Sequence, residues 1–426
     1  MTTCGCDFQS HENRCKVTTQ NIEVVFGDPR WQLAPATVRR ESLVSFQLTS
    51  PALLGDQAVV WLSPSMTATS KFRLFDEPKG PELVVHLAHP TALLAGMGLS
   101  SRISLALADA GLSAADRRAL APLMVLRSCR ERDRKITEVF ACTKLRDGGI
   151  VFALTGVLDE SASDNFADPL DWGLSEIAKA DRMITEMSSF VTHDEGVEIE
   201  QKLTILRDAD IWSLAHALKD AIGGHHFPNW LPDVGNEFSR FSQQVQLFEV
   251  IGNPGERGYV SFIARPDGKF LVKRKYFDQD QLRRREEFRF DVELSNLTFD
   301  EYLKEEFPSL QFREMPEFSR QRFDINLESA VTGHCYGIEL DEVVVPAEGL
   351  ATLRQIEIEY YKSRIHHGLD LGTVEHQLHE LVGQVQVFAA DYGVLAEPGY
   401  LSKLTFLKSM ASPCVLGTEE DQGILV

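Results

Sequence analysis

The chain has 426 residues, of which 43% are hydrophobic and 25% charged, and its formal net charge at pH 7 is −20. A chain of this length is long enough for two or three domains, each with its own core, and the composition is ordinary for a globular protein. The negative charge argues against broad electrostatic binding to duplex nucleic acid or to an anionic membrane surface. It still permits a basic pocket inside an acidic shell.

The sequence shows no export or membrane signal. No apolar run is long enough to span a bilayer, and no apolar signal segment opens the chain. The seven cysteines are an odd number in a large chain, which argues against a secreted disulfide framework. We therefore expect a cytoplasmic protein without a membrane partner. The sequence predicts no oligomeric state.

Four potential zinc ligands lie close together near the N-terminus, namely Cys4, Cys6, His11 and Cys15. Thiolate and imidazole ligands hold zinc tetrahedrally, but the spacing of these four residues differs from that of a standard zinc knuckle. The surrounding stretch is polar. We therefore interpret residues 1–20 as a flexible tail that carries thiols, in preference to a zinc site.

Residues 21–160 have the mixed pattern of an α+β domain. Short β-branched and aromatic runs over residues 21–90 are separated by Pro, Gly, Asp and Ser, and they predict strands. Apolar residues then recur at helical spacing in Ser101–Ala110 and Ala114–Leu126, with Ser113 as the expected N-cap of the second helix. We find no phosphate-binding loop, nucleophile motif or metal-spaced histidine pair here, so the role of this domain is not predicted.

A linker and a helix follow. Residues 161–195 begin with Asp, Ser, Asn and Pro and little apolar content, as linkers do. Apolar residues then recur at helical spacing over Leu174–Met187. We expect a separate second domain over residues 196–410, and a tail over residues 411–426.

The second domain opens with a charged strand. In this strand Glu198, Glu200 and Lys202 alternate with uncharged residues, and a period of two places the three charges on one face. Two carboxylates and an ammonium in one row suit a divalent cation beside a phosphate, because hard oxygen ligands take the metal and the lysine attracts the anion. For one isolated strand, the alternative is a half-exposed sheet with a solvated polar face.

Later segments repeat this alternation of charge. Several β-type runs with short turns predict an antiparallel sheet that is closed or nearly closed. We expect one face to be charged and the other apolar, with Phe288 and Phe290 on the covered apolar side. Acidic pairs at both ends of the sheet, with basic pairs between them, fit an interior that holds metal and polyanion together. The charged positions are Lys273, Lys275, Arg285, Glu287, Arg289, Arg320, Arg322, Glu357 and Glu359.

The order of these motifs resembles the CYTH domain of the triphosphate tunnel metalloenzyme superfamily. Its hallmark Glu-x-Glu-x-Lys strand is matched by Glu198, Glu200 and Lys202. Where the family commonly has Leu-Arg-x-Arg, this chain has Ile263 at the first arginine position and Arg265 at the second. The other matching segments are Arg320-Gln321-Arg322, Leu340-Asp341, Glu357-Ile358-Glu359 and Ser402-Lys403.

The resemblance implies an α+β chain whose C-terminal half is an antiparallel β-barrel, a triphosphate tunnel with flanking helices, preceded here by a separate α+β domain. It implies that Mg²⁺ or Mn²⁺ is held by Glu198, Glu200, Glu357 and Glu359, with Glu287 as a further candidate. It also implies that a triphosphate is bound by basic side chains, namely Lys202, Arg265, Lys273 or Lys275, Arg320 and Arg322. The phase of Arg285 adds it to this group, and Glu198, Glu200 and Lys202 are the expected catalytic residues.

We expect metal-dependent hydrolysis of a nucleoside, thiamine or inorganic triphosphate, because hydrolysis needs no nucleobase or ribose pocket and none is recognisable in the sequence. Such reactions depend on positioning the phosphate chain and neutralising its charge. The resemblance also permits a class IV-type adenylate cyclase that makes a cyclic nucleotide and pyrophosphate. A third alternative is a non-catalytic nucleotide or polyphosphate sensor coupled to the N-terminal domain. The retained glutamates favour an enzyme, because carboxylates without metal hinder anion binding.

Overall fold

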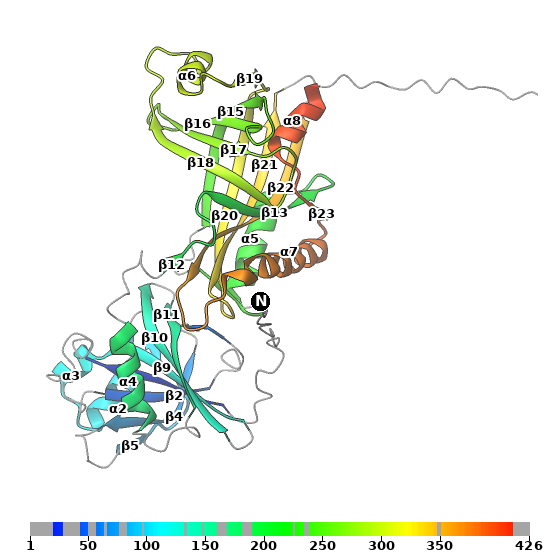
Figure 1. Ribbon diagram of the computed structural model, residues 1–426. Coiled ribbons are helices and arrows are strands. Elements are labelled where there is room, and N and C mark those ends of the chain that lie inside the picture. The colour runs from blue at the N-terminus through cyan, green and yellow to red at the C-terminus, as the bar shows by residue number, and fades with distance from the viewer. Residues whose placement is uncertain are drawn as a thin grey trace, which may run out of the picture.

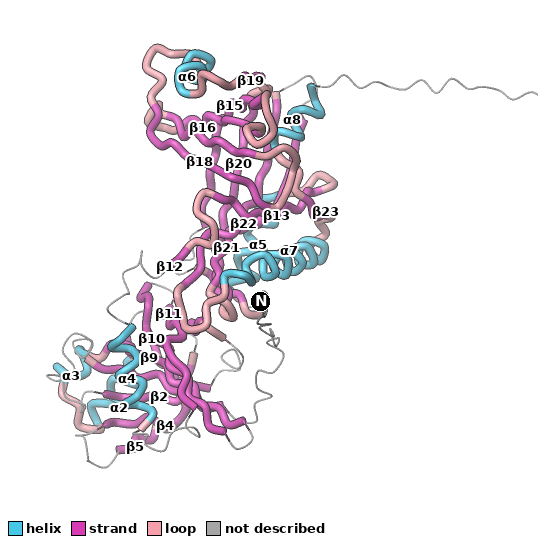
Figure 2. Tube along the Cα trace, in the orientation of Figure 1, coloured by secondary structure: helices cyan, strands magenta, loops and turns pink. Residues whose placement is uncertain are grey.

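The computed structural model describes residues 20–28, 43–49, 57–63, 66–75, 83–95, 98–131, 134–146, 149–159, 168–180, 190–224, 226–233, 238–346 and 351–411. The four residues considered as zinc ligands, Cys4, Cys6, His11 and Cys15, lie outside the described residues. Within the described residues the protein is a mixed α/β structure made mostly of strands, with two large, curled antiparallel sheets (Figure 1 and Figure 2). No helix in this part of the chain is long and apolar enough to cross a membrane.

Among the described residues, nine N-terminal strands form the first sheet, in the order β3-β11-β10-β9-β1-β2-β4-β5 with β6 beside β4. The helices here are α2 (Ser101–Asp109), α3 (Ala114–Ala119) and α4 (Pro169–Ala180). A separate strand pair is formed by β7 (Leu94–Ala95) and β8 (Gly98–Leu99). The strands of the sheet are β1 (Gln20–Gly27), β2 (Leu43–Thr49), β3 (Val59–Leu62), β4 (Thr67–Phe75), β5 (Leu83–His86), β6 (Thr91–Ala92), β9 (Ala121–Glu131), β10 (Arg134–Arg146) and β11 (Gly149–Asp159).

Helices cover both faces of this sheet. On one face Leu174 and Ile177 of α4 belong to a buried apolar cluster with Met124 of β9. On the other face Ile103 and Leu107 of α2 join a larger cluster with side chains of β1, β2 and β4. Burial of apolar side chains on both faces gives the sheet a two-sided core.

The second helix predicted in this region is wrong beyond residue 119. Ser113 caps α3 as predicted, and its Oγ accepts a hydrogen bond from the backbone N–H of Asp116 at 3.1 Å. The chain then enters β9, because Pro122 lacks the N–H that a helix interior requires. Val125 pairs with strands on both sides, which places it in the middle of the sheet. Burial between two strands overrides the helical spacing of the sequence.

In the part of the C-terminal half that the structure describes, twelve strands form the second sheet, in the order β12-β22-β21-β20-β15-β16-β17-β18-β13-β23, with β14 beside β20 and β19 beside β15. The strands are β12 (Phe190–Val191), β13 (Val197–Ile205), β14 (Trp230–Pro232), β15 (Phe238–Ile251), β16 (Gly258–Ala264), β17 (Phe270–Tyr276), β18 (Arg283–Val292), β19 (Gln311–Glu314), β20 (Phe318–Ser329), β21 (His334–Val345), β22 (Ala351–Arg364) and β23 (Ala396–Gly399).

β13 connects the two sides of this curled sheet. It pairs with β18 through residues 197–199 and with β22 through residues 199–204. The pairing therefore leads from β22 through β21, β20, β15, β16, β17 and β18 to β13, and from there back to β22. The sheet has an inner and an outer face as a result.

Alternation along β13 decides which side chains lie inside. Ile199 and Leu203 belong to the apolar cluster on the outer face, under α5 (Ile211–Gly223) and α7 (Val374–Asp391). A short 3-10 helix, η4 (Leu371–Thr373), precedes α7. Because side chains alternate between the faces of a strand, the charged residues between the apolar ones point to the inner face.

Two further helices complete this half of the chain. α6 (Phe299–Glu306) packs Leu303 into an apolar cluster with side chains of β15, β16 and β17. α8 (Lys403–Ala411) packs Leu404 and Leu407 against Val245 and Phe318, which lie on the inner face. We infer that α8 closes one end of the inner space.

In Figure 1 the N-terminal sheet lies below the C-terminal sheet, and the two are in contact. The backbone N–H groups of Ala58 and Val59 donate to the carbonyl oxygen of Ala330 at 2.8 and 2.9 Å. The N–H of His367 donates to the carbonyl oxygen of Leu154 at 2.7 Å. The end of the C-terminal sheet is thus joined to β3 and β11 by backbone hydrogen bonds.

Candidate active site in the C-terminal sheet

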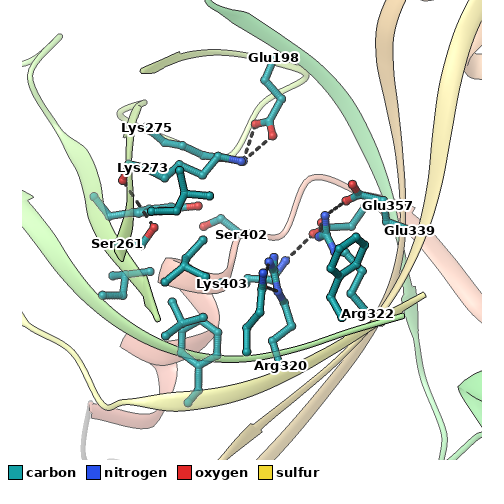
Figure 3. A pocket seen from close by; sticks show the side chains of 18 of the residues that line it. Glu198, Ser261, Lys273, Lys275, Arg320, Arg322, Glu339, Glu357, Ser402 and Lys403 are labelled. Carbon is teal, nitrogen blue, oxygen red and sulfur yellow. Dashed lines mark hydrogen bonds and ion pairs between the residues drawn. The ribbon is translucent and has the colours of Figure 1, made fainter. Parts of the chain in front are cut away.

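The inner face of the C-terminal sheet surrounds a cavity of about 240 Å³ (Figure 3). Of the described residues, seven cationic side chains and five carboxyl groups line it, although the whole chain carries a net charge of −20. Behind this lining Glu200, Glu286 and Asp341 are also buried, so positive and negative groups are nearly balanced in number. The lining cations are Lys202, Lys273, Lys275, Arg284, Arg320, Arg322 and Lys403, and the lining carboxyl groups are Glu198, Asp324, Glu339, Glu357 and Glu359.

The charged row of β13 forms one side of this site. Glu198 and Glu200 are 6% and 1% exposed. Lys275 donates to both oxygens of Glu198 at 2.5 and 2.6 Å, and Arg284 donates to Glu198 at 3.2 Å and also to Glu200. Burial alone would raise the pKa of Glu198, but Lys275 and then Arg284 lower this pKa well below its usual value. Glu198 is therefore a buried, ionised carboxylate.

A second cluster of ion pairs lies on β20, β21 and β22. Arg322 donates two hydrogen bonds to Asp341, both at 2.7 Å, and one to Glu357 at 2.5 Å. The Nζ of Lys403 lies 2.8 Å from Asp341 and 2.7 Å from Glu357, and Lys202 also pairs with Glu357. Although burial opposes ionisation, Arg322 and Lys403 lower the pKa of Asp341 to about 2. Lys202 and Lys403 likewise lower the pKa of Glu357 well below its usual value.

The guanidinium of Arg320 makes weaker contacts with carboxylates than the guanidinium of Arg322 does. Its Nε donates to the side-chain oxygen of Gln243 at 3.1 Å, and its ion pair with Asp341 is long, at 3.9 Å. Burial and then repulsion from Arg322 lower the pKa of Arg320. An anion in the cavity would therefore stabilise the charge of this guanidinium, since charge-assisted hydrogen bonds are among the strongest in proteins.

Two lining carboxyl groups have raised pKa values, in contrast to Glu198 and Glu357. Burial, followed by repulsion from Glu198 and Glu339, raises the pKa of Glu359 well above its usual value. Burial and then Glu339 raise the pKa of Asp324 to about 7, and one buried oxygen of Asp324 has no hydrogen-bond partner. Asp324 therefore titrates near neutral pH, and Glu359 takes up a proton more readily than an ordinary glutamate does.

The donor chemistry of the site suits a hard divalent cation. Besides burial, repulsion from Glu198 and from Glu339 raises the pKa of Glu359, and a dication beside these carboxylates would relieve that repulsion. Carboxylate oxygens are the ligands that Mg²⁺ and Mn²⁺ prefer. Among the described residues, however, no three His, Cys, Asp or Glu side chains are assembled closely enough to hold a metal. The chemistry fits, and the carboxylates would have to move to coordinate the ion.

The structure brings most of the predicted site residues together. Glu200 is buried behind the cavity lining, and the others in the cluster line the cavity itself. The predicted residues found in this cluster are Glu198, Glu200, Lys202, Lys273, Lys275, Arg320, Arg322, Glu357 and Glu359.

Three predicted residues, Arg265, Arg285 and Glu287, lie outside the cavity, and their placement corrects the sequence interpretation. Arg265 follows the end of β16, where its side chain is exposed and pairs with Asp291 at 2.6 Å. Arg285 and Glu287 are exposed and pair with each other. On β18 the inward positions are Arg284 and Glu286, because Arg284 is the residue that pairs directly with Glu198 of β13. The predicted phase of β18 was therefore wrong by one residue.

Several residues of the site were missed or left without a role. Arg284 stands in a run of three arginines that resembles a solvated turn, and only its pairing with β13 shows that it points inward. Glu339 shares the phase of Asp341 on β21, so alternation from the predicted Leu340-Asp341 segment could have found it. Asp324 follows Arg322 at the same spacing. The same alternation would have identified it.

No family model matches the sequence, and no curated protein matches it at a significant level. Among solved structures, the chain is similar to HpAC1 from Hippeastrum, a candidate adenylyl cyclase with a dominant triphosphatase activity. This match has 16% identity and a TM-score of 0.30, over 50% of this chain and 96% of that chain. The RNA triphosphatase Pct1 of S. pombe matches with 13% identity and a TM-score of 0.20, over 46% of this chain and 83% of that chain.

A third similarity covers both halves of the chain. The di-domain ARO/CYC protein StfQ of the steffimycin biosynthetic pathway matches with 6% identity and a TM-score of 0.16, over 88% of this chain and 96% of that chain. At TM-scores this low, none of these similarities assigns a fold or an activity. The interpretation of the cavity therefore depends on its own residues.

Proposed function

We propose that the C-terminal half of the chain is a triphosphate tunnel in which a nucleoside, thiamine or inorganic triphosphate is hydrolysed with the help of Mg²⁺ or Mn²⁺. The observation that carries this proposal is the interleaving of buried lysines, arginines and carboxylates around one cavity. Buried charges are costly unless they are paired. A ligand that needs these charges would explain why the chain buries so many of them on one inner face.

The cationic side chains would bind and orient the phosphate chain. Arg320 and Lys273 are the best placed, because Arg320 has a long ion pair of 3.9 Å and Lys273 is partly exposed. Lys202, Lys275 and Arg322 would exchange a carboxylate partner for a phosphate oxygen when substrate binds. Holding the phosphates in line and neutralising their charge is most of what phosphoryl transfer requires from a protein.

Glu198, Glu200, Glu357 and Glu359 are the residues that we propose as metal ligands, and Glu339 now joins them as a neighbour of Glu359. The bound ion would supply charge neutralisation on the phosphoryl oxygens. Ligand exchange links the two binding events. When a phosphate oxygen binds an ammonium or guanidinium group, the carboxylate that was paired with that group becomes available to the metal. We therefore expect the triphosphate and the metal to bind cooperatively.

Two carboxyl groups with raised pKa values are candidates to accept or donate a proton in the reaction. Asp324 has a pKa raised to about 7 and lines the cavity beside Arg320 and Arg322. Glu359 lies among the proposed metal ligands with a pKa raised well above its usual value. A group whose pKa lies near the working pH is suited to accept a proton from water during hydrolysis. We propose Asp324 as that acceptor.

A non-catalytic sensor is the second candidate, and one contact favours it. β22 carries Glu357 and Glu359 in the cavity and ends at Arg364, whose guanidinium donates to Thr143 of β10 at 3.3 Å. Occupancy of the cavity would then reach the N-terminal sheet through this strand. A cyclase is the remaining alternative, and its product distinguishes it.

Product analysis separates the three activities. We would incubate the purified chain with ATP, GTP, thiamine triphosphate and tripolyphosphate, each with Mg²⁺ and with Mn²⁺. Release of orthophosphate supports hydrolysis, and a cyclic nucleotide with pyrophosphate identifies a cyclase. Saturable binding without turnover would contradict the enzyme and support the sensor.

A further inference from the structure

Two exposed phenylalanines lie on β18 beside the cavity. Phe288 is 48% exposed and Phe290 is 67% exposed. Their rings stack on each other, with centroids 5.9 Å apart and an angle of 18° between the planes. We predicted them to lie on a covered apolar face, and this prediction is wrong. Exposing two large aromatic rings side by side forgoes the free energy of burying them, which calls for an explanation in terms of binding.

These rings belong to the inner face of the sheet. Alternation along β18 gives Phe288 the same phase as Arg284, which lines the cavity, and Glu286, which pairs with Lys273. The stacking of Phe290 on Phe288 places Phe290 on the same side. Phe288 also pairs directly with Lys273 of β17. The Lys273 ammonium lies 4.9 Å from the centre of the Phe288 ring and lines the cavity. One lysine therefore lines the cavity and also contacts Phe288 of the aromatic pair.

The rings lie where the curled sheet is open. β18 pairs with β13 only through residues 283–285, so its remaining residues have no hydrogen-bonded neighbour in β13. Glu286 is the last buried residue of β18, and the exposed stretch begins immediately after it. The chain thus passes from a buried charged row to an exposed aromatic pair within two residues on the same face.

We propose that Phe288 and Phe290 bind the aromatic ring of an organic triphosphate whose phosphate chain occupies the cavity. This inference depends on the proposed function and narrows its substrate class to triphosphates that carry a nucleobase or a similar heteroaromatic ring. The cavity of about 240 Å³ is smaller than the roughly 300–1,000 Å³ of pockets that enclose whole small molecules. It accommodates the phosphate chain, and the rest of the substrate lies at the mouth.

Stacking explains why the rings are both exposed and adjacent to a cation. Every nucleobase has a π face, so stacking on a phenylalanine is strong and tolerant of base identity. Lys273 adds its charge next to the point where the phosphate chain emerges. Inorganic tripolyphosphate has no ring, so it would use the cavity alone.

The test compares ligands with and without a ring. We would measure dissociation constants and KM for ATP, GTP, thiamine triphosphate and tripolyphosphate with the full chain, and with Phe288→Ala, Phe290→Ala and the double variant. Tyr392→Ala is the matched control. It removes another exposed aromatic ring, 46% exposed and stacked on Phe388, from a different part of the same half.

We expect the alanine variants to weaken binding of the ring-bearing ligands by about 5- to 100-fold, as loss of a base–aromatic stack does. Tripolyphosphate should bind unchanged, and Phe288→Trp should retain nucleotide affinity. The relative loss for ATP, GTP and thiamine triphosphate identifies the preferred ring. Equal losses for tripolyphosphate and ATP, or no loss for any ring-bearing ligand, would overturn the aromatic subsite.

The outcomes also separate this inference from the proposed function. If the wild-type chain turns over both tripolyphosphate and ATP and the variants do not discriminate between them, only the aromatic subsite fails. If the wild-type chain binds ATP and tripolyphosphate without turnover, the proposed hydrolase activity is wrong. The dissociation constants of the variants then still test the aromatic subsite. If neither ligand binds, both are wrong.

Discussion

At the scale of single residues, Arg320 tests whether the cavity is built for an anion. Its pKa is lowered by burial and by Arg322, so the surrounding protein groups do not fully stabilise its charge. We predict that Arg320→Gln weakens triphosphate binding by at least about tenfold, since hydrogen bonds to charged groups contribute about 1.5–3 kcal/mol. The melting temperature should change little. Arg265→Gln, outside the cavity, is the control for both measurements, and an equal loss of affinity in the two variants would contradict the site.

Asp324 makes a prediction about stability and pH. Its pKa is raised from 3.8 to about 7 in the folded protein, so between these values the folded state binds more protons than the unfolded chain. The contribution of Asp324 to stability is therefore present below about pH 4 and is lost as the pH rises to about 7. We expect Asp324→Asn to stabilise the protein relative to wild type at pH 8 but not at pH 4, by at most about 4 kcal/mol. Parallel stability–pH curves for the two proteins, measured by urea unfolding, would rule this out.

At the scale of elements, a buried ion pair joins the end of β22 to β20. Arg364 is 1% exposed and donates to Glu328 through two hydrogen bonds, at 2.5 and 2.7 Å. Arg364→Ala leaves a buried carboxylate without its partner, which typically costs about 3–5 kcal/mol. We predict a loss of that size in urea unfolding. The double variant Arg364→Met/Glu328→Leu should recover much of it, and if the double variant is as unstable as the single one, the pair is not what holds this strand end.

Alternation and strand pairing explain which parts of the site were predictable. Alternation on β13 predicted the inward row correctly because its other face carries no charge, with Ile199 and Leu203 in the outer core. On β18 both phases carry charge, so the sequence pattern alone is ambiguous. The pairing of Arg284 with Glu198 decides the phase, and such a contact between distant segments has no local signal.

In the N-terminal half, short β-type runs were predicted as strands, but β9 was assigned to a helix. Its residues carry helical spacing, and only their position between β1 and β10 makes them a strand. The same limitation applies to the exposure of Phe288 and Phe290. Their apolar character favours burial, and the opening of the sheet beyond residue 285 is a property of the assembled strands.

At the scale of the whole molecule, we propose that residues 196–410 form a domain of their own, preceded by an α+β domain over residues 21–160. The described contacts between the two sheets include a few backbone hydrogen bonds and a small apolar cluster around Val59 and Val151. We predict that the N-terminal half can be removed while the fragment from residue 190 onward still unfolds cooperatively in urea. A fragment without a cooperative transition would show that the halves form one folding unit.

The most direct test of the central claim is the rate of orthophosphate release from ATP and tripolyphosphate in two matched double variants. Glu198→Ala/Glu200→Ala removes the charged pair of β13 that points inward, and Arg285→Ala/Glu287→Ala removes an exposed ion pair on β18. We predict metal-dependent release by the wild-type chain and the second variant, and loss of at least about 100-fold in the first, as expected when charge-stabilising groups leave an active site. Folding of both variants would be checked by their melting temperatures. Equal rates in the two variants, or no release by the wild-type chain with either metal, would contradict a triphosphatase in this cavity.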